Sequence, residues 1–322
     1  MSSSLTVSPT HDHLKFCYLG SGVQNNSFTF NAVTISTSVV LAVLSPIAVV
    51  GNILIMAVIW RNQTLRTPSY ILLSGLAFTD FCTGFITQPL FVASRFICFE
   101  SSQETNAPLL SFLPYTIAFS AGCSSYFNAL TLLLITLMSI ERWLHMTRRS
   151  LLTVRRSCLI VAALMVLLIP LAAVHLKHIL KKISDPVWTA LFSVILLFCI
   201  ITTSIAYFTV FKIIRRHQLQ VTTNETSQNF GQPAINLAKY KKSVFTILYI
   251  LALLFASVLP LLVFAVLSLF SYNLSVLDLT FQIALTFSYL SSSLNPLMYL
   301  WRMNDIRNGV KQLLNRLLCK DG

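Results

Sequence analysis

The sequence predicts an all-α membrane protein, a bundle of seven transmembrane helices followed by a short amphipathic helix. Apolar residues make up 55% of the 322 residues and charged residues only 10%, whereas about a quarter of a soluble domain is charged. The apolar residues form seven long runs separated by short clusters of charge. A spanning helix needs roughly 20 such residues, and lipid offers no hydrogen-bond partner to an irregular backbone. The pattern is therefore typical of a chain that crosses a bilayer repeatedly.

The chain divides into three parts. Residues 1–32 are expected to be an extracellular tail, residues 33–301 the bundle, and residues 302–322 a cytoplasmic amphipathic helix and tail. The expected spans are approximately 33–60, 69–94, 111–141, 154–176, 187–213, 243–270 and 278–301.

The amphipathic helix is expected at residues 302–318, directly after the last span. Ile306, Val310 and Leu313 recur there at helical spacing with basic residues between them, as in a helix that lies on the membrane surface. Cys319 at its end is a candidate for palmitoylation, and a free cysteine explains it equally well.

The placement of Lys and Arg predicts a multi-pass membrane protein with its N-terminus outside. The net charge is +13, and all but five of the 23 basic residues fall in segments that would then face the cytoplasm. The five outer ones are Lys15, Arg95, Lys177, Lys181 and Lys182. This one-sided charge suits anionic lipids and a cytoplasmic partner, and it does not indicate nucleic acid. Asn25 and Asn273, which begin glycosylation sequons, both fall outside.

The second span carries a carboxylate, Asp80, at mid-membrane depth, where a charge costs about 2.5–3.5 kcal/mol on insertion scales. Polar side chains recur at helical spacing on other spans and are expected to converge on it. They include Asn52, Ser124, Asn128, Thr131, Ser288, Ser291, Ser292, Asn295 and Tyr299. Such groups commonly join helices by hydrogen bonds, but a buried carboxylate also needs a cation or a proton. From the residues alone, a bound Na⁺ and a protonated Asp80 are equally good interpretations.

Several of these positions resemble the motifs of the rhodopsin-like (class A) G-protein-coupled receptors. The matching segments are Gly51-Asn52, Leu76-Ala77-Phe78-Thr79-Asp80, Glu141-Arg142-Trp143, Tyr207, Pro260 and Asn295-Pro296-Leu297-Met298-Tyr299. They are similar to the GN pair, the LAxxD, DRY and NPxxY motifs, and the fifth-helix tyrosine and sixth-helix proline of that family. Because the matches occur in the expected helices and order across residues 51–301, the chain resembles a divergent, orphan-type member.

The resemblance implies a mechanism and a set of residues. An extracellular ligand would favour outward movement of the sixth helix around Pro260, which would open a cleft for a heterotrimeric G protein. The coupling residues implied are Glu141, Arg142, Tyr207, Asn295, Pro296 and Tyr299. The implied sodium pocket is Asp80, Thr131, Ser291, Ser292 and Asn295, which favours the ion over the proton.

The chain also departs from the family pattern. Val258 stands at the position of the sixth-helix toggle tryptophan, and Ile117 at that of the third-helix disulfide cysteine. The usual outer disulfide is therefore not expected, and Cys17 and Cys98, both outside, are the candidate replacement pair. Tyr240 stands where many relatives carry an acidic residue that locks the arginine, which predicts raised basal activity.

The predicted ligand contacts are Ser124, Asn128 and Tyr289. Ser124 stands where amine receptors carry an aspartate, and the seventh span has no lysine for retinal. Neither a biogenic amine nor retinal is favoured. The otherwise apolar sixth helix suits a largely apolar small molecule or a peptide terminus.

Three other function classes were weighed against a receptor. An ion-coupled transporter or channel would use Asp80, but it predicts further ionisable residues along a pathway. A receptor-like protein that does not signal agrees with the missing tryptophan and disulfide. An enzyme is not predicted, since no pair of catalytic groups shares a depth and no phosphate loop or His/Cys metal cluster occurs. No cofactor is expected apart from a structural Na⁺.

Overall fold

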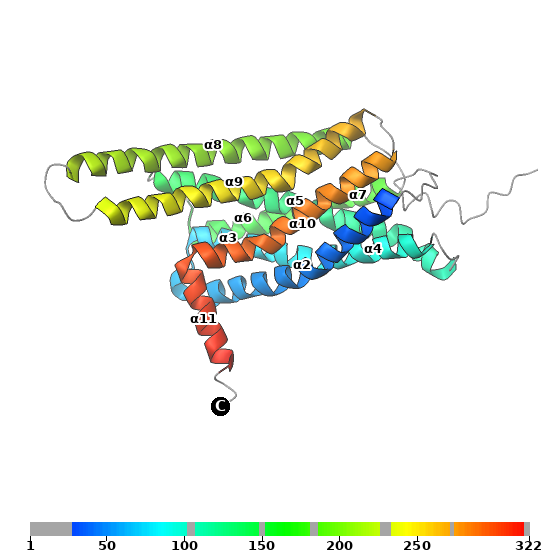
Figure 1. The fold of residues 1–322 in the computed structure, drawn as a ribbon, viewed down its shortest axis with the longest axis horizontal. Helices are drawn as coiled ribbons and strands as arrows, with labels where there is room; N and C mark the ends of the chain where they lie inside the picture. The colour runs from blue at the N-terminus through cyan, green and yellow to red at the C-terminus, as the bar shows by residue number, and fades with distance from the viewer. Residues whose placement is uncertain are drawn as a thin grey trace, which may run out of the picture.

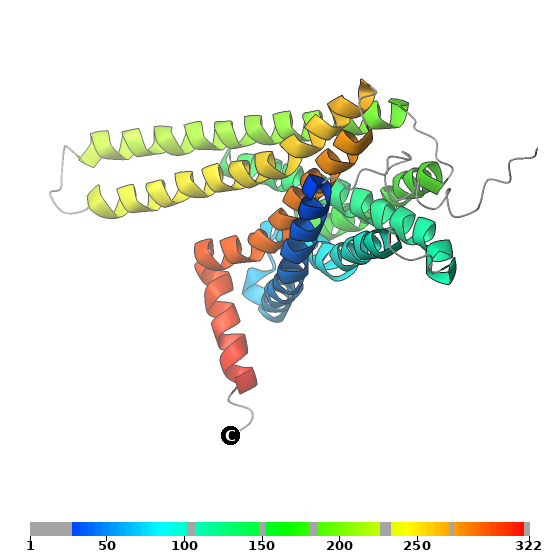
Figure 2. The ribbon, with the colours of Figure 1, turned by 45° about the vertical axis from the view of Figure 1, so that its right-hand side comes forward.

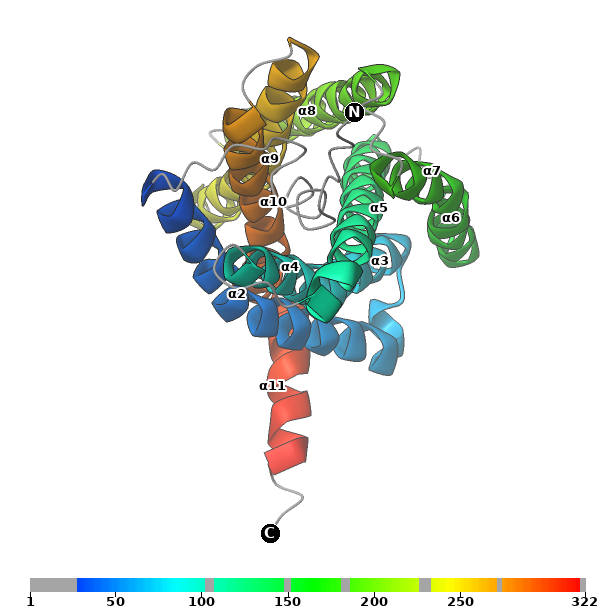
Figure 3. The same ribbon diagram turned by 90° about the vertical axis from the view of Figure 1, so that its right-hand side faces the viewer.

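The chain folds into an all-α bundle, as predicted. The computed structural model describes residues 28–101, 107–147, 152–180, 186–225, 233–270 and 274–318. Within these ranges every regular element is helical, and the helices run roughly along one axis (Figure 1). Viewed along that axis they surround a common interior (Figure 3). The seven-transmembrane fold class is confirmed.

Each of the seven predicted spans corresponds to a helix or to a stack of helices. In chain order they are α2 (Phe28–Arg61); α3 (Pro68–Cys82), η2 (Thr83–Thr87) and α4 (Gln88–Ser101); α5 (Ala107–Met146); α6 (Val154–Leu167) and α7 (Ile169–Leu180); α8 (Pro186–Glu225); α9 (Pro233–Leu269); and α10 (Leu274–Arg302). A short 3-10 turn, η1 (Gln63–Leu65), joins the first two spans. Helices α8 and α9 pack side by side and extend beyond the other spans at one end (Figures 1 and 2).

Six of these helical stretches are long and apolar enough to cross a membrane. They are Ala32–Arg61, Pro68–Ile97, Tyr115–Met146, Val154–Val174, Ala190–Arg216 and Leu251–Leu269. Their outer faces expose large apolar side chains such as Val43, Leu167 and Phe198, as expected of surfaces that face lipid. The seventh span, α10, is less apolar because polar residues occur along its length, from Asp278 to Asn295.

The second span differs from the single helix expected at 69–94, because the π-helical turn η2 interrupts it, beginning three residues after Asp80. At this turn the Thr83 hydroxyl donates to the Thr79 carbonyl over 2.9 Å. The Ser45 hydroxyl of α2 donates to the Gly84 carbonyl over 2.7 Å. These contacts satisfy backbone oxygens that a π turn leaves exposed, and such turns are frequent at functional sites. The first two spans approach closely here.

The fourth span is also interrupted, at Leu168 between α6 and α7. Pro170 follows in the first turn of α7, where it has no N–H to donate to the preceding turn. Helical hydrogen bonding resumes with the Ala172 N–H, which donates to the Leu168 carbonyl over 3.1 Å.

Helix α11 (Asn304–Leu318) turns sharply away from the bundle axis after α10 (Figures 1 and 2). It packs on α2 and α10, and Ile306 and Val310 are buried in the same core cluster as Ile55 and Val58. The amphipathic helix predicted at 302–318 is confirmed.

Candidate functional site

The centre of the bundle holds Asp80, whose carboxylate is fully buried on α3. Asn295 Nδ2 on α10 donates to Asp80 Oδ2 over 2.8 Å, and the Ser292 hydroxyl lies close enough to interact with the same carboxyl group. The other oxygen, Oδ1, has no hydrogen-bond partner within the described part of the chain. The predicted meeting of Asp80 with Ser292 and Asn295 therefore occurs, and it leaves one carboxylate oxygen open.

Asn52 on α2 holds the neighbouring turn of α10. Its Nδ2 donates to the Ala48 carbonyl over 2.8 Å and to the Ser292 carbonyl over 3.2 Å. This contact depends on the preceding residue, because a Cβ on Gly51 would lie 2.7 Å from the Cβ and Cγ of Pro296. Only glycine lets α2 approach the proline of α10 this closely. Asn52 Oδ1 is a second buried oxygen without a partner in the described residues.

Thr131 and Ser291 complete the predicted sodium set but lie differently around Asp80. The Thr131 hydroxyl shares a hydrogen bond of 2.9 Å with the Thr79 hydroxyl, which joins α5 to α3 one residue before Asp80. Ser291 is buried on α10, without a described hydrogen bond to Asp80. Of the predicted sodium set, Ser292 and Asn295 contact the Asp80 carboxyl group, whereas Thr131 and Ser291 have no described contact with it.

The three predicted ligand contacts are brought together between α5 and α10. The Ser124 hydroxyl is hydrogen-bonded to the Tyr289 hydroxyl, and Ser288 donates to Asn128 Oδ1 over 2.8 Å. Tyr289 is fully buried, and the ring of Phe91 on α4 meets it edge to face at 5.9 Å. Val258, at the position of the expected tryptophan, is buried in the same apolar cluster as Tyr289.

At the end of the bundle that is predicted to be cytoplasmic, Glu141 and Arg142 have different surroundings. Glu141 is buried, and its Oε2 accepts a hydrogen bond of 2.7 Å from the Ser69 hydroxyl on α3. Among the ion pairs of the described residues, none joins Glu141 to Arg142. The acidic neighbour is thus held by the second span and leaves the guanidinium to other groups.

Arg142 lies within electrostatic range of the hydroxyls of Tyr207 on α8 and Tyr299 on α10. Both tyrosines are buried, and Tyr207 and Tyr299 also lie close to each other. The side chain of Arg142 itself is half-buried. Residues of the third, fifth and seventh spans therefore lie within electrostatic range of one another at this end of the bundle.

The remaining predicted modification sites cannot be placed. Asn25, Asn273, Cys17 and Cys319 lie outside the described residues, and the side chain of Cys98 does as well. The same holds for the side chain of Tyr240.

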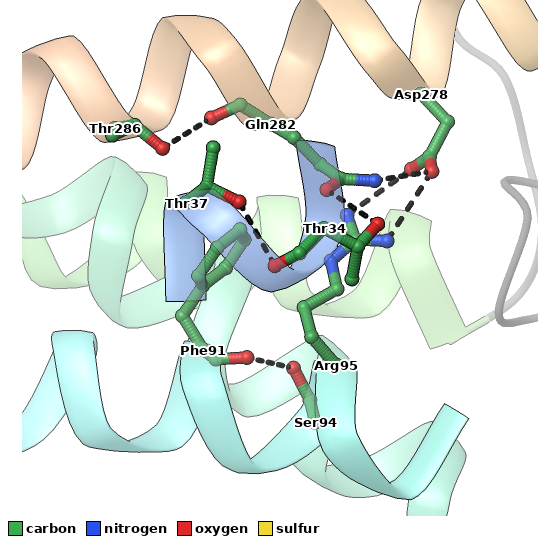
Figure 4. Close-up of polar contacts among 8 residues, drawn as sticks. All are labelled: Thr34, Thr37, Phe91, Ser94, Arg95, Asp278, Gln282 and Thr286. Atoms are coloured by element: carbon green, nitrogen blue, oxygen red, sulfur yellow. Dashed lines mark hydrogen bonds and ion pairs between the residues drawn. The ribbon is translucent and has the colours of Figure 1, made fainter. Parts of the chain in front are cut away.

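At the opposite end, sequence reasoning missed a buried ion pair. Arg95 in the middle of α4 and Asp278 near the start of α10 form two contacts, of 3.1 and 3.2 Å (Figure 4). From the sequence, Arg95 is expected only on the outer side of the membrane, and Asp278 only as the first residue of the last span. The available signal was weak: one basic and one acidic residue at span ends that share a side.

Comparisons with known proteins agree with this geometry. A family model described as "7 transmembrane receptor (rhodopsin family)" matches residues 51–299. Neuromedin-U receptor 2 of Mus musculus is 26% identical over 299 residues, which cover 83% of this chain and 72% of that protein. Olfactory receptor 14I1 of Homo sapiens is 25% identical over 300 residues, covering 83% and 86%. Melanopsin of Rattus norvegicus matches a shorter stretch, 28% identical over 36% of this chain and 22% of that protein.

Proposed function

The chain belongs to the rhodopsin family of seven-transmembrane receptors, and we propose that it binds an extracellular ligand and activates a heterotrimeric G protein at the plasma membrane. Family membership makes it a signalling receptor and not an enzyme. It also supports a receptor over an ion-coupled transporter or channel. The ligand, the G protein and the helix movement are the parts that we propose.

The observation that carries G-protein coupling is the arrangement around Arg142. Its acidic neighbour, Glu141, is hydrogen-bonded to Ser69, and the described ion pairs include none between Glu141 and the arginine. Its guanidinium lies near Tyr207 and Tyr299. A guanidinium that is not paired with a carboxylate can donate hydrogen bonds to the carbonyl oxygens at the C-terminus of an incoming helix, whose dipole favours a cation.

We infer that the sixth span, α9, opens this site. Pro260 interrupts the backbone hydrogen bonds of α9 about a helix turn from Leu254 and Val258, which pack in the core. Outward movement of the cytoplasmic half of α9 would uncover Arg142 between α5, α8 and α10. A ligand shifts the equilibrium toward this open arrangement only if the ligand binds the open arrangement more tightly than the resting arrangement.

The proposed ligand contacts are Ser124, Asn128 and Tyr289. They support this role because they join α5 to α10 one or two helix turns from the Asp80 cluster. A ligand that competes for the Ser124–Tyr289 hydrogen bond would change how these two helices are held together.

We also propose that Na⁺ binds at Asp80 in the resting receptor. The support is the pair of buried, unpartnered oxygens, Asp80 Oδ1 and Asn52 Oδ1, in a cluster that includes Ser292 and Asn295. A bound cation would neutralise the carboxylate. The residues that bind the cation would then hold the second, third and seventh spans together.

The deciding experiment measures basal activation of a panel of Gα subunits by the wild type and by Arg142→Ala at matched surface expression. Wild-type activity is expected without ligand, since the arginine is not locked by Glu141, and Arg142→Ala should abolish it. Arg61→Ala is the matched control, because Arg61 is an exposed arginine at the same end of the bundle. Wild-type activity that persists in Arg142→Ala would refute the coupling role.

If the wild type shows no basal activity, a C-terminal segment of each Gα subunit is fused to the receptor and thermal stability is measured. If no Gα segment raises the thermal stability of the wild type above that of Arg142→Ala, G-protein coupling is refuted and a non-signalling relative is supported. Enzymatic deglycosylation of intact cells tests the proposed orientation, since Asn25 and Asn273 carry glycans only if they face outside.

A further inference from the structure

The predicted extracellular end of the bundle contains a polar network built on the ion pair of Arg95 and Asp278. Arg95 Nη1 lies 3.2 Å from Asp278 Oδ2 and Nη2 lies 3.1 Å from Oδ1. Gln282 Nε2 also donates to Asp278 Oδ2 over 2.9 Å, and the Thr34 hydroxyl donates to Gln282 Oε1 over 3.1 Å. Figure 4 shows Arg95 of α4 and Gln282 of α10 contacting Asp278, while Thr34 of α2 contacts Gln282. Two parallel contacts are the geometry with which arginine recognises a carboxylate.

The two partners of this ion pair differ in their access to the outside. The side chain of Arg95 is 12% exposed, whereas that of Asp278 is 1% exposed. An incoming group can therefore reach the guanidinium and cannot reach the carboxylate. Because the accessible partner is the cation, this end of the bundle is suited to an anionic group and not to a cationic one.

Asp278 keeps a partner if the guanidinium leaves it. Gln282 is fully buried on the same helix, one turn further along, and Thr34 fixes its orientation through the amide oxygen. A hydrogen-bonded amide reduces the penalty of a buried carboxylate that has lost its cation. Another carboxylate could therefore replace Asp278 at Arg95 while Asp278 keeps its hydrogen bond to Gln282.

Arg95 is also connected to the proposed ligand contacts. Its guanidinium carbon lies 5.2 Å from the centre of the Phe91 ring, a distance at which a cation is attracted to an aromatic face. The same ring packs edge to face on Tyr289, which is hydrogen-bonded to Ser124. A group bound at Arg95 therefore borders an aromatic surface that leads to those contacts.

We propose that Arg95 is the anchor for a carboxylate of the extracellular ligand, and that Asp278 is a built-in carboxylate that occupies the guanidinium until the ligand arrives. This rests on the proposed function of a ligand-binding receptor and adds the chemical class, an acidic molecule or an acidic peptide terminus with an apolar body. The ligand competes with Asp278 for Arg95, and Asp278 then remains on Gln282. Such competition would release α4 from α10 at the outer end.

The test replaces the built-in carboxylate with a free one, acetate. Thermal unfolding of purified receptor is followed in acetate and in chloride at equal ionic strength and pH, for the wild type and for Asp278→Ala. Acetate is expected to raise the Tm of Asp278→Ala at roughly tenfold or more lower concentration than that of the wild type, because the built-in carboxylate acts at a high effective concentration. The double variant Arg95→Ala with Asp278→Ala should show no acetate effect.

Asp305→Ala is the matched control, because it removes a carboxylate from the other end of the bundle, where Tyr70 donates to it. Its response to acetate should equal that of the wild type. If Asp278→Ala does not fold, Asp278→Asn removes the charge with little change of shape and is expected to show the same preference. The proposal would be overturned if neither Asp278→Ala nor Asp278→Asn had a different Tm in acetate than in chloride. It would also be overturned if acetate stabilised the double variant as much as Asp278→Ala. The measurement needs no G protein, so its failure leaves the Arg142 result intact, and the reverse also holds.

Discussion

Replacing Gly51 by alanine tests the close approach of α2 and α10 on which the central cluster depends. The new Cβ would lie 2.7 Å from the Cβ and Cγ of Pro296, whereas carbon atoms in contact are about 3.5–4.0 Å apart. The proline ring is rigid and cannot turn away, so the two helices must shift by about 1 Å. Overpacking of this kind costs about 1–3 kcal/mol. The shift would also pull the Asn52 amide from the Ser292 carbonyl.

Gly122→Ala is the matched control on α5. A Cβ there would lie 3.6 Å from Leu176, an ordinary contact, so the variant should only gain the helix propensity of alanine, up to about 1 kcal/mol. The same gain reduces the net loss expected for Gly51→Ala to about 0–2 kcal/mol. Thermal unfolding in detergent can be followed with a thiol-reactive dye, because Cys82 and Cys199 are buried in the folded receptor. A Gly51→Ala variant as stable as Gly122→Ala would refute the packing argument.

Three further predictions concern other parts of the site. Asp80→Asn should abolish the stabilisation of the purified receptor by NaCl relative to an organic-cation chloride, a gain of about 2.7 kcal/mol at Na⁺ a hundredfold above its Kd; an unchanged gain would exclude Asp80 as a ligand. Ser69→Ala should lower basal G-protein activation, because Glu141 loses its hydroxyl partner and becomes free to pair with the adjacent arginine. Ser69→Thr, which keeps the hydroxyl, should not, and raised activity in the alanine variant would contradict this reasoning. Gly309→Ala should speed amide hydrogen exchange in α11 while leaving α5 unchanged, because its Cβ would collide with Val58; slow exchange in α11 would show that the helix docks otherwise.

The helices themselves were predictable from the sequence because hydropathy and the helical period are local properties. Bilayer thickness fixes the length of a span, so residues 33–60 and 278–301 could be assigned before any contact was known. The second and fourth spans were both expected to be uninterrupted, and the interruption of the second has a tertiary cause. The π turn after Asp80 is stabilised by the hydroxyl of Ser45 on another helix, and no pattern within residues 69–94 carries that information.

Contacts between distant residues were predicted only where the family motifs pointed to them. Asp80 and Asn295 were expected to meet, because each belongs to a motif with a known place in the bundle. The pairing of Arg95 with Asp278 was missed, since these residues are 183 positions apart and belong to no such motif. The contact between Ser69 and Glu141 was also missed, because Glu141 belongs to such a motif but Ser69, 72 positions away, does not appear among the residues implied with it.

The seventh span shows why low hydropathy and function coincide in this chain. Its inward face carries Asp278, Gln282, Tyr289, Asn295 and Tyr299, and each makes a polar contact or lies in electrostatic range of a residue on another helix. Polar residues at this depth are costly in lipid, so they persist only where partners on other helices satisfy them. These contacts occur in sequence from the outer ion pair, through the predicted ligand contacts and the Asp80 cluster, to Arg142. A displacement of the outer end of α10 would therefore act on a helix that makes polar contacts with other spans at several depths.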